Sequence, residues 1–280
     1  MIGTNHYNPG RTLPGVAEQL GQLGFRTTVV QSKDNPEKSA EGLPGLEALK
    51  TADVAVFFMR FLTLPDDQLR LVTDYLKSGK PVVGFRTSTH AFAYEKDDPR
   101  SKWNDDFGRD ALGSKYFIHL QGKTKVTAAD SAKEHSILAG TDFDGVTCGG
   151  TLYLSDLPSN AVVLLEGSGK SKKTGRVTNA FGTHDLQAEM TQPVAWTWTN
   201  KWGGRTFGTT LGHPATFEQK SFVKLCLNGI CWAAGQEALA GKAQMGDKPG
   251  GKADKKKGSK SGSQKKKDCL LYTSPSPRDS

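Results

Sequence analysis

The chain has 280 residues, of which 36% are hydrophobic and 24% are charged, and its formal net charge is +8. This composition supplies enough apolar side chains for a core and excludes a wholly disordered chain, and no apolar run is long enough to predict a membrane span. Four cysteines in a chain of this length exclude a disulfide scaffold. Nucleic-acid binding stays open until the position of the excess positive charge is known.

The positive charge is concentrated near the C-terminus. Residues 1–240 contain 26 Lys and Arg against 25 Asp and Glu, a net charge of +1, whereas residues 241–268 contain 10 Lys against 3 Asp, a net charge of +7. We therefore expect a nearly neutral folded domain, for which nucleic acid is not an expected partner; a tail that binds an anionic partner stays open as an alternative. The predicted parts are the domain at residues 1–235, a Lys/Gly/Ser-rich disordered tail at 236–268, and a segment at 269–280 that resembles a translated sequencing adapter.

Helices and strands alternate in the first half of the chain. Helical spacing of apolar residues predicts helices at residues 13–23 and 65–76. Continuously apolar runs predict strands buried on both faces at residues 54–59 and 81–85, and a β-rich run predicts another strand at 25–30. This alternation is typical of an α/β fold with a parallel sheet.

The second half is less regular and richer in strands. A short helix is expected at residues 104–112, a basic loop at 170–176 and a closing helix at 217–234. Short strands are predicted at residues 116–119, 125–128, 151–154 and 161–166, and a hairpin at 193–199 and 205–211.

The predicted strand ends indicate where a ligand would bind. In open α/β sheets, ligands bind beyond the carboxyl ends of the parallel strands, which here selects the loops at residues 3–10, 60–64 and 86–94. Only Met1 and Ile2 precede the first of these loops, so we expect the first strand to be truncated. For that reason the sequence leaves the cellular compartment open.

Seven motifs occur in the order found in one known family. They are GLEALKTAD at residues 45–53, LPDDQ at 64–68, YLKSGKPVVG at 75–84, RTSTHAF at 86–92, PVAW at 193–196, GRTFGTTLGH at 204–213 and NGICWAAG at 228–235. Together they resemble the ThuA-like (trehalose utilisation) family over most of residues 2–235. The resemblance implies a flavodoxin-like three-layer sandwich with a mostly parallel central sheet, related to class I glutamine amidotransferases. It also implies a role in carbohydrate metabolism, with a small-molecule sugar as the partner.

The sequence departs from the amidotransferase pattern at the reactive turn. Class I amidotransferases carry a cysteine on a sharp G-x-C-x-G turn, whereas the corresponding stretch from Gly84 to His90 contains neither a cysteine nor a second glycine. The stretch at residues 211–218 resembles a relic of the amidotransferase His-x-Glu, but its glutamate is wrongly spaced. Glutamine hydrolysis is therefore not expected.

Histidines and arginines in the selected loops are the candidate functional residues. An imidazole close to hydroxyls and a guanidinium suits general acid–base chemistry on a polyol, and a guanidinium can hold a carboxylate or carbonyl oxygen. An enzyme of this kind would be a sugar-processing hydrolase or isomerase. The candidates are His90, His213 and Ser88 for the chemistry, and His6, Arg60, Arg86 and Thr87 for substrate binding.

Several alternatives accompany this interpretation. The histidines could bind a divalent metal, but no H-x-H or H-x-x-E spacing supports such a site, so no metal and no cofactor is expected. Ser88 could act as a nucleophile paired with His213. The tryptophans at positions 196, 198 and 202 could stack on a sugar ring or divide between core and surface. A non-catalytic carbohydrate-binding domain that retains the fold is the alternative function, and homo-oligomer formation stays open.

Overall fold

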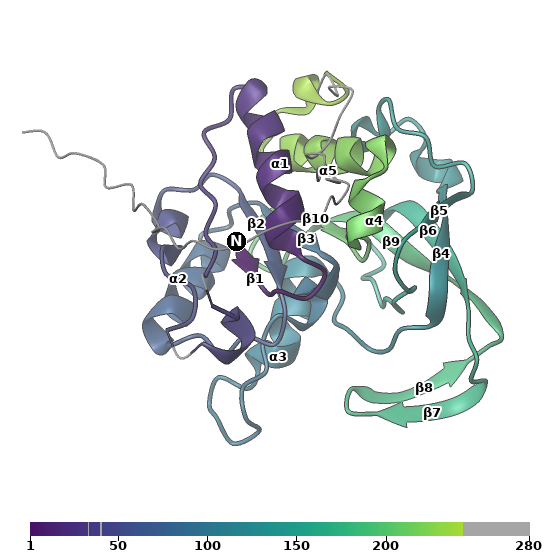
Figure 1. Ribbon diagram of the computed structural model, residues 1–280, viewed down its shortest axis with the longest axis horizontal. Coiled ribbons are helices and arrows are strands. Elements are labelled where there is room, and N and C mark those ends of the chain that lie inside the picture. Colours follow the sequence, from purple (N-terminus) through teal and green to yellow (C-terminus); the bar gives the residue numbers. More distant parts are fainter. Residues whose placement is uncertain (33, 40, 243–280) are drawn as a thin grey trace, which may run out of the picture. The chain divides into compact units, whose positions relative to one another are not determined.

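The computed structural model describes residues 1–32, 34–39 and 41–242. The fold of these residues contains five α-helices and ten strands, together with short 3-10 and π-helical turns. Two units divide the chain, Met1–Pro249 and Gly250–Ser280, and the fold belongs to the first. The predicted tail beyond residue 242 and the adapter-like segment lie outside the described residues. The helices are α1 (Pro9–Gln22), α2 (Asp66–Lys77), α3 (Trp103–Asp106), α4 (Pro214–Phe217) and α5 (Lys220–Ala233) (Figure 1).

An eight-stranded mixed sheet forms the centre of this unit, in the order β1-β2-β3-β10-β9-β6-β4-β5. Strands β1, β2, β3 and β10 pair in parallel, and the pairs from β10 to β5 are antiparallel. The predicted α/β class is confirmed. The strands are β1 (Ile2–Gly3), β2 (Ala55–Met59), β3 (Val82–Phe85), β4 (Gln121–Ala128), β5 (Val146–Cys148), β6 (Val162–Lys170), β7 (Gly175–Asn179), β8 (Gly182–Leu186), β9 (Glu189–Thr199) and β10 (Arg205–Thr209).

Helices cover both faces of the parallel part of the sheet. Successive residues of a strand point to opposite faces, so Phe58 of β2 packs with the apolar side chains of α1 and α5, while Phe57 packs with those of α2. Both phenylalanines are fully buried. This two-sided burial explains why β2 and β3 are continuously apolar in the sequence.

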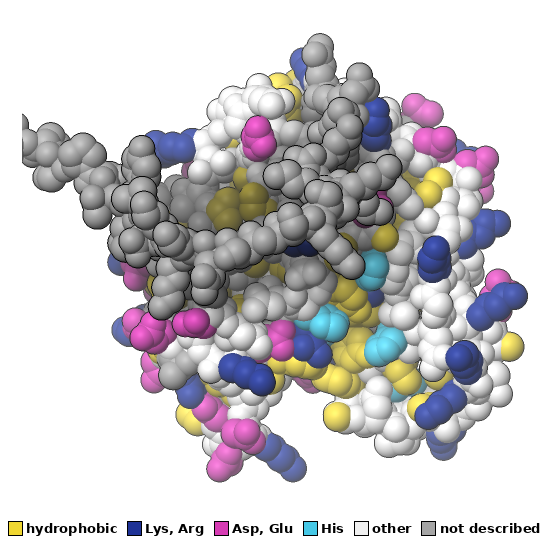
Figure 2. All heavy atoms as spheres, viewed as in Figure 1, with side chains coloured by type: hydrophobic (Ala, Val, Ile, Leu, Met, Phe, Trp, Pro, Cys, Tyr) yellow, Lys and Arg dark blue, Asp and Glu magenta, His cyan; other side chains and the backbone are white. Residues whose placement is uncertain are grey.

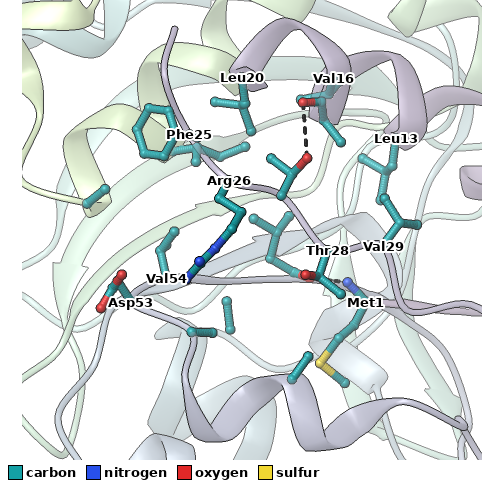
Figure 3. A pocket seen from close by; sticks show the side chains of 18 of the residues that line it. Met1, Leu13, Val16, Leu20, Phe25, Arg26, Thr28, Val29, Asp53 and Val54 are labelled. Atoms are coloured by element: carbon teal, nitrogen blue, oxygen red, sulfur yellow. Dashed lines mark hydrogen bonds between the residues drawn. The ribbon is translucent and has the colours of Figure 1, made fainter. Parts of the chain in front are cut away.

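A cavity separates the predicted strand at residues 25–30 from the sheet, and the prediction of a strand there is wrong. Only Gln31 forms a bridge, to Ile2, and the Ile2 amide donates to the carbonyl of Val30 at 2.8 Å. The cavity of about 610 Å³ lies between this stretch, α1 and the start of β2. Figure 3 shows the stretch passing across the cavity, with side chains of α1 above it and Val54 beyond it. Residues 26–29 therefore lack a neighbouring strand to pair with.

In the second half of the chain, some local predictions differ from the structure. The strands expected at residues 116–119 and 151–154 reduce to a single bridge between His119 and Tyr153. The loop expected at residues 170–176 is confirmed at residues 171–174, which join β6 to the separate β7–β8 hairpin. Regular structure also continues beyond residue 235, where Glu237–Leu239 form a 3-10 helix and Glu237 pairs with Arg205 at 2.5 Å.

Close packing between β9 and β10 gives a testable prediction. The fully buried Trp196 donates through Nε1 to the Leu112 carbonyl at 2.7 Å and lies opposite Gly208, where an added Cβ would sit 2.5 Å from the indole ring. We expect Gly208→Ala to lower the free energy of unfolding by about 1–3 kcal/mol, because the ring and the backbone must move apart. Urea unfolding measures this. The control Gly15→Ala, in α1 where a Cβ meets nothing within 4 Å, should raise stability by about 0.5–1 kcal/mol. A Gly208→Ala variant as stable as the parent would contradict this packing.

Candidate functional site

The candidate site lies where the parallel strands β1, β2 and β3 end. The loop after β1 carries His6 and Tyr7, β2 is followed directly by Arg60, and β3 runs into a 3-10 helix at Arg86–His90. Because these strands are parallel neighbours, their carboxyl ends share one edge of the sheet. The three loops selected by the sequence thus come together.

Backbone strain is concentrated in the same three loops. The non-glycine residues with positive φ in the described part of the chain are Tyr7 (65°), Asn8 (49°), Phe61 (48°) and Arg86 (42°). Each strand end contributes at least one of them. A side chain in this left-handed region costs roughly 1–2 kcal/mol, and such residues cluster at functional sites.

Arg86 occupies the strained turn that directly follows β3. Its guanidinium lies over the rings of Tyr7 and Tyr153, 4.3 and 4.7 Å from their centroids. It donates to the Thr210 carbonyl at 2.8 Å and to the Tyr7 hydroxyl at 3.1 Å. Only 1% of the residue is exposed, Nε has no partner, and no carboxylate among the described residues lies within 4 Å. It is therefore a buried cation that has no acidic partner in the described part of the chain.

His90 lies at the end of the same 3-10 helix and is 5% exposed. Its ring centroid is 4.5 Å from that of Tyr116 and 5.0 Å from that of Phe61. Burial, followed by the positive charges of Arg60 and Arg86, lowers the pKa of this imidazole to about 3. His90 is consequently neutral at pH 7, suited to donating a hydrogen bond or polarising a carbonyl rather than to accepting a proton.

An ion pair borders the site beside His6. Arg60 Nη1 contacts a Glu37 carboxylate oxygen at 2.8 Å, and the Thr4 hydroxyl donates to the other oxygen. The exposed His6 ring lies 4.1 Å from Tyr7 and has no hydrogen bond to another described residue. Burial and the charge of Arg60 lower the pKa of His6, while Glu37 opposes this shift. His6 is therefore a solvent-exposed imidazole that lies near the carboxylate of Glu37.

The antiparallel half of the chain completes the site with aromatic residues. The Tyr116 hydroxyl and His119 Nδ1 are 2.6 Å apart, and the ring of Tyr116 packs against Tyr153 at 5.1 Å. Phe181, between β7 and β8, meets Tyr116 edge-on at 4.8 Å. Figure 2 shows histidine side chains grouped among hydrophobic ones on this face, with Lys or Arg side chains beside them.

We call the group formed by these residues the strand-end cluster: His6, Tyr7, Glu37, Arg60, Arg86, His90, Tyr116, His119 and Tyr153. Five of its members were not selected from the sequence as site residues: Tyr7, Glu37, Tyr116, His119 and Tyr153. Tyr116, His119 and Tyr153 fell in stretches predicted to be strands, which gave no reason to select them, whereas Tyr7 lay in one of the selected loops.

His213 borders this cluster through Tyr7, and the side chains of His213 and Ser88 are engaged by backbone groups. The His213 ring lies 5.6 Å from Tyr7 but makes no ring contact with His90, and its Nδ1 accepts the Ala215 amide at 3.2 Å as the cap of α4. The Ser88 hydroxyl donates to the Phe57 carbonyl at 2.9 Å and accepts the Met59 amide at 3.1 Å, so it joins the turn to β2.

The remaining sequence candidates lie elsewhere or contribute little. Thr87 is fully buried and its hydroxyl has no partner among the described residues. Trp196 belongs to the core, and Trp202 lies in the β9–β10 turn beside Gly79, at the opposite end of β3. Within residues 1–242, as far as they are described, no group of three His, Cys, Asp or Glu residues could hold a metal ion, and no helix is long and apolar enough to cross a membrane.

The fold and site define an α/β protein with a polar cluster at the ends of its parallel strands. The ThuA (trehalose utilisation) family model matches residues 4–233, so the chain belongs to the ThuA family. A crystal structure of a ThuA-like protein from Parabacteroides merdae aligns with a TM-score of 0.51 at 18% identity, covering 83% of this chain and 88% of that one. A ThuA-like protein from Bacteroides uniformis aligns with a TM-score of 0.48 at 15% identity, over 82% and 88% of the two chains. No curated protein matches the sequence.

Proposed function

We propose that this ThuA-family protein binds a small sugar at the strand-end cluster and acts on a sugar or keto-sugar by histidine-assisted acid–base chemistry. The proposal includes no glutamine amidotransferase activity, because the stretch from Gly84 to His90 contains no cysteine. The observation that carries it is the strain at three neighbouring strand ends, each of which presents a polar side chain to the same place.

The side chains of the cluster divide into two roles. Tyr7, Tyr116 and Phe181 supply aromatic surface against which the C–H face of a sugar ring packs. The neutral His90 donates a hydrogen bond to the sugar's carbonyl or hydroxyl oxygen, and His6 moves the proton, since its ring is exposed and lies close to Glu37. His213 and Ser88 are assigned structural tasks, consistent with the backbone groups they bind.

Binding and turnover of a panel of disaccharides and keto-sugars test this proposal. We expect His6→Gln and His90→Gln to reduce turnover by about 10²–10⁴-fold, the usual contribution of a positioned acid or base. The matched control is His135→Asn, because His135 caps a distant 3-10 helix and stacks near Trp232. Binding without turnover by the parent protein would support the non-catalytic alternative. Absence of binding across the panel would refute the proposal.

A further inference from the structure

The charge balance of the strand-end cluster is incomplete. Arg86 is almost fully buried, yet its contacts are a carbonyl, a phenol and two aromatic faces. Cation–π contacts offset only part of the free-energy cost of taking an ion out of water. Buried charges are normally paired for this reason. Arg86 therefore lacks a negatively charged partner among the residues that the structure describes.

The neighbouring ionisable groups do not supply that charge. Glu37, the nearest acid on the β1–β2 side, is already engaged by Arg60 and Thr4. The phenol of Tyr116 has its pKa raised, first by burial, so it remains protonated and neutral. Among the described residues of the cluster, the two guanidinium groups thus outnumber the single carboxylate.

The surroundings of Arg86 are shaped to hold the guanidinium in place. An added Cβ at Gly150 would lie 2.7 Å from Arg86 Nη2, and one added at Gly212, whose φ is 131°, would lie 3.4 Å from the Arg86 Cβ. The side chain is therefore fixed from several elements while its own backbone is strained at φ 42°. Arg86 therefore combines a strained backbone with a desolvated charge, and its hydrogen bonds to Thr210 and Tyr7 do not neutralise that charge.

We propose that the ligand of the strand-end cluster is an acidic sugar, whose carboxylate supplies the negative charge that Arg86 lacks. This inference rests on the proposed function and narrows its substrate class to uronic or aldonic acids. The Tyr7 hydroxyl accepts a hydrogen bond from Arg86 Nη2, and a hydrogen bond between the two phenols raises the pKa of Tyr153, as expected when Tyr153 is the donor. Tyr7 therefore keeps its own proton for the carboxylate. A hydroxyl that accepts a hydrogen bond from a cation becomes a stronger donor. Because Tyr7 is only half-buried, its hydroxyl extends the effect of the buried Arg86 charge to a bound ligand.

Calorimetric titration of the full chain with matched acids and neutral analogues tests the inference. The probes are D-glucuronate, D-galacturonate, D-gluconate and lactobionate, each compared with its methyl ester or parent sugar at pH 7.5. At least one acid should bind about 10-fold or more tightly than its neutral partner, as expected for a charge-assisted hydrogen bond. Tyr7→Phe and Arg60→Gln should each reduce that ratio, since the first removes the hydroxyl and the second leaves Glu37 unpaired.

The outcomes separate the two proposals. Arg109→Gln is the control, because this exposed arginine pairs only with Asp105 and Asp106 on α3, and the acid-to-neutral ratio should not change. If neutral sugars bind and no acid binds more tightly, the acidic-sugar inference is overturned while the proposed function stands. If the acids bind more tightly but Tyr7→Phe and Arg60→Gln leave the ratio unchanged, binding lies elsewhere and the inference also fails. If nothing in the panel binds, both proposals fail.

Discussion

Lowering the pH from 7.5 to 4.5 should destabilise this protein by about 3 kcal/mol through His90 alone. The pKa of the imidazole is about 3 in the folded protein and about 6.5 when exposed in the unfolded chain, so the unfolded state binds the proton more readily. The stability contributed by neutral His90 is complete above pH 6.5 and is lost as the pH falls towards 3. Urea unfolding at both pH values measures the difference.

A variant without the imidazole isolates this effect from other titrating groups. His90→Gln should be less stable than the parent at pH 7.5 but should show a shallower loss between pH 7.5 and 4.5. His135→Asn, which removes a less buried histidine with a lowered pKa, should follow the parent profile more closely. If the parent and His90→Gln profiles ran parallel, His90 would have to be solvated, and its proposed role as a neutral donor would be wrong.

The elements that could be predicted from the sequence are those whose spacing of apolar residues follows directly from which of their faces are buried. The spacing of Leu13, Val16 and Leu20 predicts α1, because these side chains face the core cluster. The continuous apolar runs of β2 and β3 are explained by helices on both faces. The β7–β8 hairpin carries no such signal: its residues are mostly polar and exposed, and its pairing depends on the two strands meeting each other rather than on a core.

Four of the nine residues of the strand-end cluster could also be predicted, for a topological reason. His6, Arg60, Arg86 and His90 follow strands, and the rule that ligands bind at strand ends does not require knowledge of distant contacts. Glu37 and Tyr153 reach the site from segments that no strand-end rule selects, through an ion pair with Arg60 and a stack on Arg86. Their positions depend on tertiary packing, so the local sequence contains no equivalent signal.

Replacing Arg86 by methionine should abolish sugar binding while changing the free energy of unfolding by no more than about 1 kcal/mol. Methionine keeps much of the aliphatic volume but removes the charge, so the loss of hydrogen bonds to Thr210 and Tyr7 is offset by relief of desolvation. Affinity for the tightest-binding probe should fall about 100-fold or more, because the charge that complements the ligand is gone. Calorimetric titration and urea unfolding of the same preparation measure both quantities.

The control for this variant is Arg205→Met. Arg205 lies 4.0 Å from the Trp232 ring centroid, so it shares a cation–π contact with Arg86, but it pairs with Glu237 and lies outside the strand-end cluster. Its replacement should leave binding unchanged. A large loss of stability in Arg86→Met, with binding intact, would mean that the guanidinium serves the fold instead. Loss of binding without loss of stability separates the two roles, since a residue retained only for packing cannot be removed without a stability cost.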